Sequence, residues 1–121
     1  MPTQCYEVNG VRVVECGGDG PRIGTDHDAV ELIGAASEHA PELMVIPVDR
    51  FGDGFFQLKT RMAGEILQKF VTYHVRVAIV GDISGHLSES GVLMDFVREC
   101  NRGCDIWFAA SMEEIWERLL G

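Results

Sequence analysis

The stretch Leu43–Ser84 decides the fold. It begins with LMVIPV (43–48), continues through a Gly/Asp loop into FFQLKTRMAGEILQKFVTYH (55–74), and ends with VRVAIVGDIS (75–84). The first and last runs are short and apolar, which favours buried strands, whereas the apolar residues of the middle run recur with helical spacing. Because a buried strand, a crossover helix and a second buried strand form a parallel unit, we expect a parallel α/β sheet.

The flanking segments extend this pattern in both directions. Asn9-Gly10 predicts an N-terminal hairpin, because both residues tolerate the positive φ of a type I′ turn. The other expected elements are strands at 43–48, 75–80 and 106–109, helices at about 26–38, 55–73 and 90–102, and a last helix capped by Ser111 with Glu114. Together they give one α/β domain over residues 1–121, with a mixed, mostly parallel sheet of about five strands and four helices.

The hairpin turn also predicts a register. Val8 should face Val11, and the pairs that follow outward from the turn are Glu7 with Arg12, Tyr6 with Val13 and Cys5 with Val14. Successive residues of a strand point to opposite faces, so one face of the hairpin carries only the apolar set Tyr6, Val8, Val11 and Val13. We expect that face to be buried.

Charge and composition narrow the classes of partner. The chain has 10 Lys and Arg against 19 Asp and Glu, a formal net charge of −9. An acidic surface repels phosphate backbones and anionic lipids, so we expect neither nucleic-acid nor membrane binding. No apolar run approaches the roughly 20 residues that span a bilayer, and no signal-peptide pattern opens the chain. We therefore expect a cytoplasmic protein.

Polar residues follow each of the predicted parallel strands. Asp82 and Ser84 come directly after the strand at 75–80, Asp49 and Arg50 follow the preceding strand, and Ser111 follows the last. Since the carboxyl ends of neighbouring parallel strands share one edge of a sheet, these residues predict a polar pocket there. The alternative is that Asp82 and Ser84 only hydrogen-bond loop amides.

Familiar catalytic and metal-binding patterns are missing from the sequence. Neither GxSxG nor a glycine-rich phosphate loop is present, and no Cys or His residues have a recognised zinc spacing. We therefore predict no catalytic residue, no metal and no cofactor.

Three motifs resemble a known family. They are AGEILQKF (63–70), VGDIS (80–84) and DFVRECNRG (95–103), followed by WFA (107–109) and an acidic last helix. They are similar to an uncharacterised bacterial family, the domain-of-unknown-function family numbered four-one-eight-zero, over nearly the whole chain. That family has no established activity, so the resemblance implies no catalytic residues.

The order of elements is also similar to that of STAS domains, the anti-sigma-factor antagonist type. These wind a β-α repeat four times after an added N-terminal strand, and here the turns would begin at Val11, Leu43, Val75 and Ile106. STAS domains typically carry a phosphorylatable serine in a DSSG motif after the second of these strands. The corresponding place reads DGFF (53–56), without the serine, and Thr60 lies a turn further on. The resemblance implies a STAS-like (βα)4 regulatory module without that switch.

Two functions follow as hypotheses. The first is a non-enzymatic regulatory or protein-interaction module, whose partner surface is the exposed side around Phe51, Phe55 and Arg61 together with the loop at 81–84. The second is a small-molecule binder or small enzyme with a polar pocket at Asp49, Asp82 and Ser84. A homodimer through the unprotected hairpin edge is compatible with either, so the expected partner is a protein or a second copy of the chain.

Overall fold

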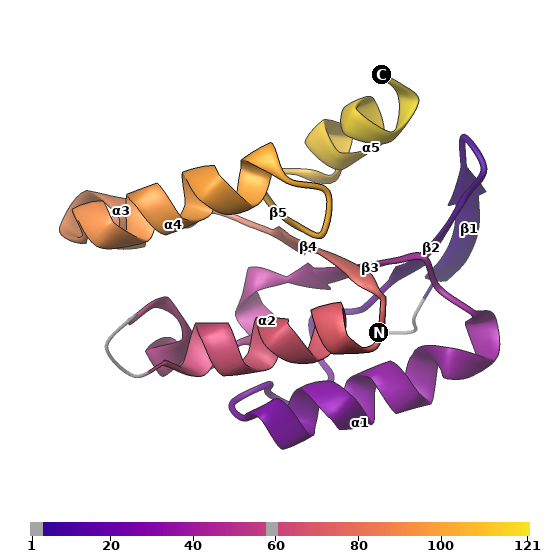
Figure 1. Cartoon of the computed structure of the whole chain (residues 1–121), viewed down its shortest axis with the longest axis horizontal. Coiled ribbons are helices and arrows are strands. Elements are labelled where there is room, and N and C mark those ends of the chain that lie inside the picture. The colour runs from indigo at the N-terminus through magenta and orange to yellow at the C-terminus, as the bar shows by residue number, and fades with distance from the viewer. Residues whose placement is uncertain (1–3, 58–60) are drawn as a thin grey trace.

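The centre of the molecule is a five-stranded sheet whose strands lie in chain order, β1-β2-β3-β4-β5 (Figure 1). The computed structural model describes residues 4–57 and 61–121. Its strands are β1 (Gln4–Val8), β2 (Val11–Glu15), β3 (Leu43–Pro47), β4 (Arg76–Val80) and β5 (Ile106–Ala109). Only the pairing of β1 with β2 is antiparallel. The predicted mixed, mostly parallel sheet is confirmed.

Helices cover both faces of the sheet. They are α1 (Asp26–Ala36), α2 (Met62–Thr72), α3 (Ser84–Glu89), α4 (Gly91–Arg102) and α5 (Met112–Leu120), with 3-10 turns η1 (Ser37–His39), η2 (Val48–Arg50) and η3 (Asp53–Phe56). Side chains alternate along each strand, so β3 turns Met44 and Ile46 toward α1, α2 and α4. Its residues Leu43 and Val45 pack in the other cluster, with α5. This burial on both faces explains why β3 and β4 read as continuous apolar runs.

The N-terminal hairpin has the predicted register. Val8 pairs with Val11 and Tyr6 with Val13, and the turn residues Asn9 and Gly10 have φ of 50° and 84°. The apolar face of the hairpin packs in the cluster that contains α5; Val13 is buried, whereas Tyr6, Val8 and Val11 are half-buried. The side chain of Asn9 also donates a hydrogen bond of 2.9 Å to the carbonyl of Leu119. The hairpin is therefore attached to the last helix as well as to the sheet.

The second helix begins later than predicted. Residues 53–56 form the turn η3 and α2 starts at Met62, while residues 58–60, Thr60 among them, lie outside the described part of the chain. Phe55 and Phe56 are both buried, at 1% and 6% exposure, with ring centroids 4.9 Å apart. Both rings therefore enter the core from the turn that precedes α2, and not from α2 itself.

A short helix, α3, replaces the loop expected after β4. Asp82 starts it by accepting a hydrogen bond from the backbone N–H of Ser84 (2.9 Å). Ser90 ends α3 and caps α4, because its hydroxyl accepts from the N–H of Leu93 (3.1 Å). The four longer helices that the sequence predicts are all present.

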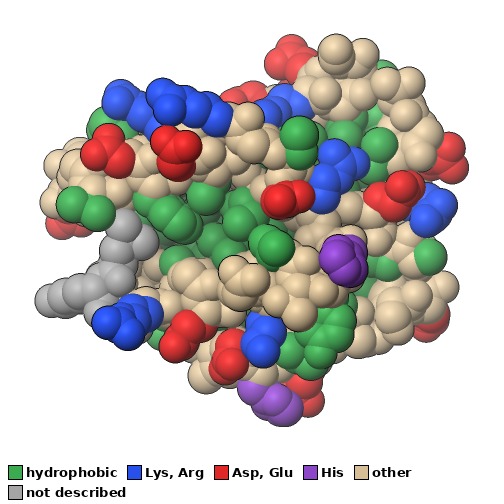
Figure 2. All heavy atoms as spheres, in the orientation of Figure 1, with side chains coloured by type: hydrophobic (Ala, Val, Ile, Leu, Met, Phe, Trp, Pro, Cys, Tyr) green, Lys and Arg blue, Asp and Glu red, His purple; other side chains and the backbone are tan. Residues whose placement is uncertain are grey.

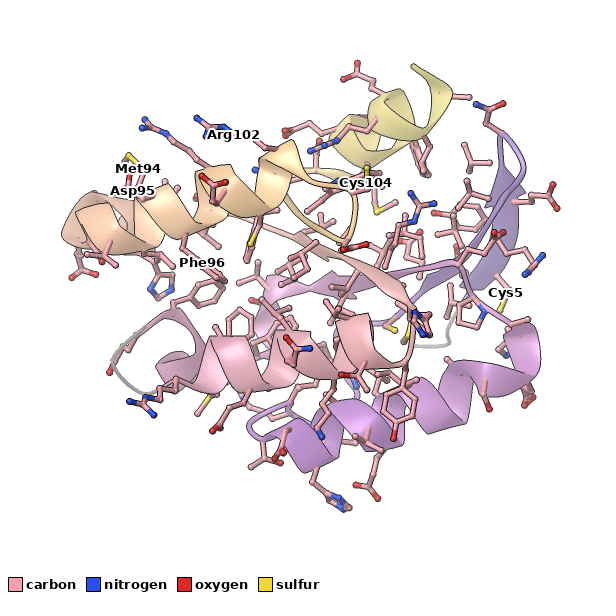
Figure 3. The ribbon with its side chains drawn as sticks, in the orientation of Figure 1. Cys5, Met94, Asp95, Phe96, Arg102 and Cys104 are labelled. Atoms are coloured by element: carbon pink, nitrogen blue, oxygen red, sulfur yellow. The ribbon has the colours of Figure 1, made fainter. Side chains whose placement is uncertain are left out.

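One face of α4 packs toward the core and the other faces solvent. Figure 3 shows Phe96 pointing toward α2, whereas Asp95 and Arg102 point away from it. The ring of Phe96 meets that of Phe108 on β5 edge to face, with centroids 6.3 Å apart. Figure 2 shows apolar side chains gathered between the α4 and α2 layers, and charged side chains around them. In the part of the chain that the structure describes, no helix has the length and apolar character needed to cross a membrane.

Candidate functional site

Two of the cavities among the described residues lie at the carboxyl edge of the parallel strands. The first, here the apolar groove, follows β4 and β5 and encloses about 270 Å³; its lining residues are Gly81, Asp82, Ile83, Ser84, Leu87, Val97, Asn101, Phe108, Ala109, Ala110 and Glu114. The second, here the polar pocket, follows β3 and encloses about 290 Å³; its lining residues are Arg22, Val48, Asp49, Phe51, Gly52, Phe56 and His86. The edge at which ligands bind in open α/β sheets therefore carries two different cavities.

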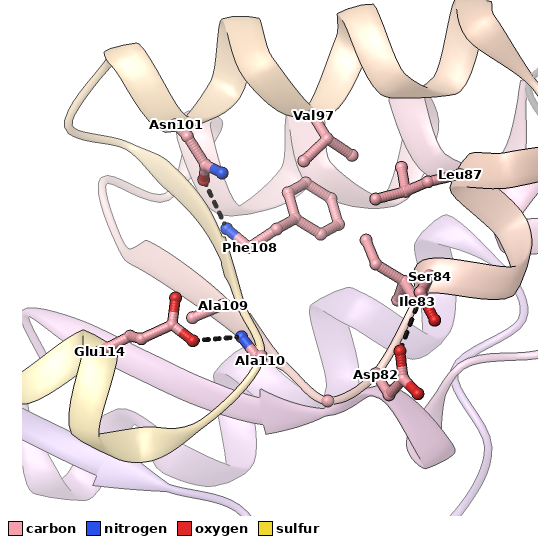
Figure 4. A pocket seen from close by; sticks show the side chains of 11 residues that line it. Asp82, Ile83, Ser84, Leu87, Val97, Asn101, Phe108, Ala109, Ala110 and Glu114 are labelled. Carbon is pink, nitrogen blue, oxygen red and sulfur yellow. Dashed lines mark hydrogen bonds between the residues drawn. The ribbon is translucent and has the colours of Figure 1, made fainter.

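The interior of the apolar groove is built from β5 and the helices beside it. Phe108 on β5 and Val97 on α4 are each 8% exposed, and Leu87 on α3 and Ile83 complete the apolar wall (Figure 4). The helix α4 packs along β5, because the side-chain oxygen of Asn101 accepts a hydrogen bond of 2.7 Å from the backbone N–H of Phe108. This bond fixes the spacing between the two walls.

The polar groups of the apolar groove are engaged in backbone hydrogen bonds. Besides Asn101, Asp82 accepts from the N–H of Ser84 at 2.9 Å, and Glu114 accepts from the N–H of Ala110 at 3.1 Å (Figure 4). The alternative in which Asp82 and Ser84 serve the loop is therefore the one that the structure supports. Hydrogen bonds from the hydroxyl and the N–H of Ser84 also lower the pKa of Asp82. Asp82 is thus a stable carboxylate, unlike a general acid or base, whose pKa lies near neutrality.

The apolar groove continues along α5. A neighbouring cavity of about 340 Å³ shares Asn101, Phe108, Ala109 and Glu114 with it and reaches Glu117 and Arg118. Arg118 donates to the carbonyl of Asn101 (2.8 Å), and its guanidinium lies 4.3 Å from the centre of the Trp107 ring. These contacts tie α5 to the end of α4 and give the groove a fixed far wall.

The polar pocket collects ionisable side chains from three separate segments. Arg22 precedes α1, Asp49 lies in η2 and His86 lies in α3, and all three are exposed. A nitrogen of the Arg22 guanidinium donates to the carbonyl of Phe51 (3.2 Å). The His86 ring stacks on Phe56, with centroids 4.5 Å apart and planes 18° apart. Sequence reasoning found Asp49 from its place after a strand but missed Arg22 and His86, which follow no strand directly.

Arg50, a predicted site residue, is a structural residue. Its side chain is 6% exposed, and it donates to the carbonyls of Pro21 (3.0 Å) and Gly17 (2.8 Å). A Cβ at Gly20 would lie 2.5 Å from its Cζ, so the loop has to keep glycine at that position. Arg50 therefore holds the loop before α1 against η2, and it lines a different cavity, beside α1, instead of the two described above.

The predicted partner surface is also corrected in part. Phe51 and Phe55 are 3% and 1% exposed, with ring centroids 4.3 Å apart, so the expectation of an exposed aromatic surface is wrong. Arg61 is exposed at the start of α2, and Ser111 occupies the N-cap position of α5 without a side-chain capping bond. Neither lines either cavity. The cap predicted for Ser111 is supplied only by Glu114.

Comparison with known families gives a match to most of the chain. A model of the family described as Domain of unknown function (DUF4180) matches residues 8–119. The chain belongs to the DUF4180 family. This confirms the resemblance inferred from the three motifs, and the matched region includes both cavities. No curated protein and no solved structure matches the chain significantly, so the similarity to STAS domains rests on the order of elements alone.

The described residues of this DUF4180 chain offer few groups for covalent chemistry. Among them, no three His, Cys, Asp or Glu residues gather where they could hold a metal ion. Burial raises the pKa of the Cys16 thiol to about 11, so it is a poor nucleophile at neutral pH. The hydroxyl of Ser84 donates to a carboxylate, Asp82, and no histidine hydrogen-bonds it in residues 4–57 and 61–121. The arrangement is suited to binding.

Proposed function

We propose that this DUF4180 chain is a non-catalytic protein-interaction module of the cytoplasm. In this proposal the apolar groove receives an apolar side chain from a partner protein. The observation that carries it is the contrast between the wall and the rim of the groove. The wall is apolar, and each hydrogen-bonded polar group of the rim serves the protein's own backbone. A group that already satisfies a loop amide has less to offer a polar substrate.

The apolar groove is large enough to take a side chain as its occupant. Its volume of about 270 Å³ lies just below the range of roughly 300–1,000 Å³ that is usual for pockets of drug-sized ligands. Protein interfaces commonly place one apolar or aromatic anchor in such a depression, surrounded by a polar rim. The groove therefore suits one anchor residue and the backbone on either side of it.

The acidic rim of the groove should favour partner segments with basic residues next to the anchor. Asp82 and Glu114 lie on the rim, Glu117 lines the adjoining cavity, and the chain as a whole carries a net charge of −9. An acidic partner would be repelled, whereas Lys or Arg next to the anchor would be attracted on approach. We therefore expect a partner segment that combines an apolar anchor with at least one basic residue.

Selection from a random peptide library displayed on phage tests this proposal. We expect the intact chain to enrich peptides that carry an apolar anchor beside Lys or Arg. Ala110 is exposed and lines the apolar groove, so Ala110→Arg should obstruct it without disturbing the core. Ala35→Arg, at an exposed position on α1, is the matched control and should bind as the wild type does. Enrichment that Ala110→Arg leaves unchanged would contradict the proposal.

Self-association is a separate prediction. β1 is the end strand of the sheet, and among the described residues no strand pairs with its outer edge. Such an edge can pair with a second copy of the chain. The mass of the chain in solution, measured over a range of concentrations, tests whether it does so.

A further inference from the structure

The polar pocket places opposite charges on one cavity without pairing them. Arg22 and Asp49 both line it, yet no salt bridge joins them within residues 4–57 and 61–121. Elsewhere the chain does pair such groups on its surface, as Arg12 with Glu42 at 3.7 Å and Arg102 with Glu99 at 3.2 Å. The cavity therefore lies between a cation and an anion that are available to a third molecule.

We propose that the polar pocket binds a small zwitterion, of which a free α-amino acid is the simplest example. A simple anion would be attracted by Arg22 but repelled by Asp49. A simple cation would be attracted by Asp49 but repelled by Arg22. A ligand with a carboxylate and an ammonium group satisfies both side chains. This inference goes beyond the interaction role, because it concerns another cavity and another class of ligand.

The donors and acceptors of the pocket match such a ligand. A guanidinium presents parallel N–H groups that fit a carboxylate, and the hydrogen bond from Arg22 to Phe51 engages only one of its nitrogens. A carboxylate such as that of Asp49 accepts charge-assisted hydrogen bonds from an ammonium group. The imidazole of His86 can donate or accept toward the remainder of the ligand. The cavity of about 290 Å³ is large enough for a small molecule of this kind.

Contacts restrain two of the three side chains, Arg22 and His86, before any ligand arrives. The bond to Phe51 restrains Arg22, and the buried Phe56 supports the His86 ring from one side. Gly81, with φ of 149°, approaches η2 so closely that a Cβ there would lie 2.8 Å from Val48 Cγ2. The turn after β4 therefore packs directly against Val48, the residue before Asp49. A pocket whose groups are restrained loses less entropy when it binds.

Titration of the intact ¹⁵N-labelled chain with each of the common L-amino acids, followed by NMR, tests the proposal. We expect at least one of them to shift the amide signals of Arg22, Asp49 and His86. Its N-acetyl derivative lacks the ammonium charge and its methyl ester lacks the carboxylate. Each should bind about tenfold more weakly or worse, as expected for the loss of a charge-assisted hydrogen bond. No shift with any amino acid would overturn the proposal, and so would equal binding of the N-acetyl form.

Two variants locate the site. Asp49 is exposed and makes no hydrogen bond in the described structure. Asp49→Asn has nearly the same shape, so the fold should be retained. This substitution should weaken the binding of the amino acid by about tenfold or more. Ala110→Arg, in the apolar groove, should leave amino-acid binding unchanged, which separates this inference from the interaction role. Binding that survives both Asp49→Asn and Arg22→Gln would overturn the assignment to this pocket.

Discussion

The apolar groove and the polar pocket lie along the same edge of one sheet, but their polar groups have different tasks. In the apolar groove, Asp82, Asn101 and Glu114 each hold a backbone N–H at 2.7–3.1 Å. In the polar pocket, Asp49 and His86 hydrogen-bond no described residue, and Arg22 makes one bond. Position at a strand end therefore does not by itself mark a functional group, because the residue's own hydrogen bonds decide whether it is free to bind.

The largest effect should come from the buried ring beneath the polar pocket. Phe56→Ala removes a side chain that is 6% exposed and supports His86. We expect a loss of about 3–5 kcal/mol in the free energy of unfolding, as for other buried aromatic residues. Urea denaturation measures it. His86→Ala, at an exposed position, should cost less than about 1 kcal/mol, and equal losses would show that the ring of His86 is structural.

The second-largest effect should be the difference in stability lost when Arg50 and Arg22, the two arginines near the polar pocket, are each replaced. Arg50→Met removes the donors that serve the carbonyls of Pro21 and Gly17. Hydrogen bonds from charged groups contribute roughly 1.5–3 kcal/mol each, so we expect a loss of about 3 kcal/mol. Arg22→Met, which breaks one part-buried hydrogen bond of an exposed side chain, should cost less, about 1 kcal/mol. Urea denaturation of both variants checks the difference, and a larger loss for Arg22→Met would reverse the roles given to them.

A smaller effect on stability should distinguish Asn101, in the apolar groove, from Asp49, in the polar pocket. Asn101→Ala leaves the N–H of Phe108 without its acceptor at 2.7 Å, which should cost about 1–3 kcal/mol. Asp49→Asn removes no hydrogen bond within the described structure and should leave the thermal midpoint nearly unchanged. Thermal denaturation followed by circular dichroism compares the two. Equal shifts in the midpoint would contradict the view that Asn101 serves the backbone whereas Asp49 does not.

The smallest effect concerns pH. The hydroxyl and N–H of Ser84 lower the pKa of Asp82 in the folded chain. Because the folded pKa is below the unfolded one, the stabilisation is complete above the unfolded value, about 3.9, and is lost as the pH falls through the folded value. NMR titration should give Asp82 a pKa below that of an ordinary aspartate. Ser84→Ala removes the hydroxyl and should move the pKa upward, and an unchanged value would contradict this cause.

The sequence was sufficient for the sheet and insufficient for the cavities at its edge, because it predicted one polar pocket with Asp49, Asp82 and Ser84 together, whereas Asp49 lines one cavity and Asp82 and Ser84 line another. The apolar runs that became β3 and β4, and the Asn9-Gly10 turn, report local preferences that tertiary packing did not override. The polar pocket instead depends on Arg22, in a loop without periodicity, and on His86, in a Gly/Ser-rich stretch that reads as a loop. The apolar spacing that includes Phe55 also fits a helix, so the pattern alone does not predict that this residue lies in η3, before α2 begins.

One NMR experiment tests the central claim, that the two cavities are separate sites for different partners. A selected basic and apolar peptide and a bound amino acid are added singly and then together to the labelled intact chain. The peptide should shift the signals of Ser84, Asn101 and Ala110, and the amino acid those of Arg22, Asp49 and His86. The two sets of shifts should add when both are present. A single shared set of shifted signals, or displacement of one ligand by the other, would contradict the account.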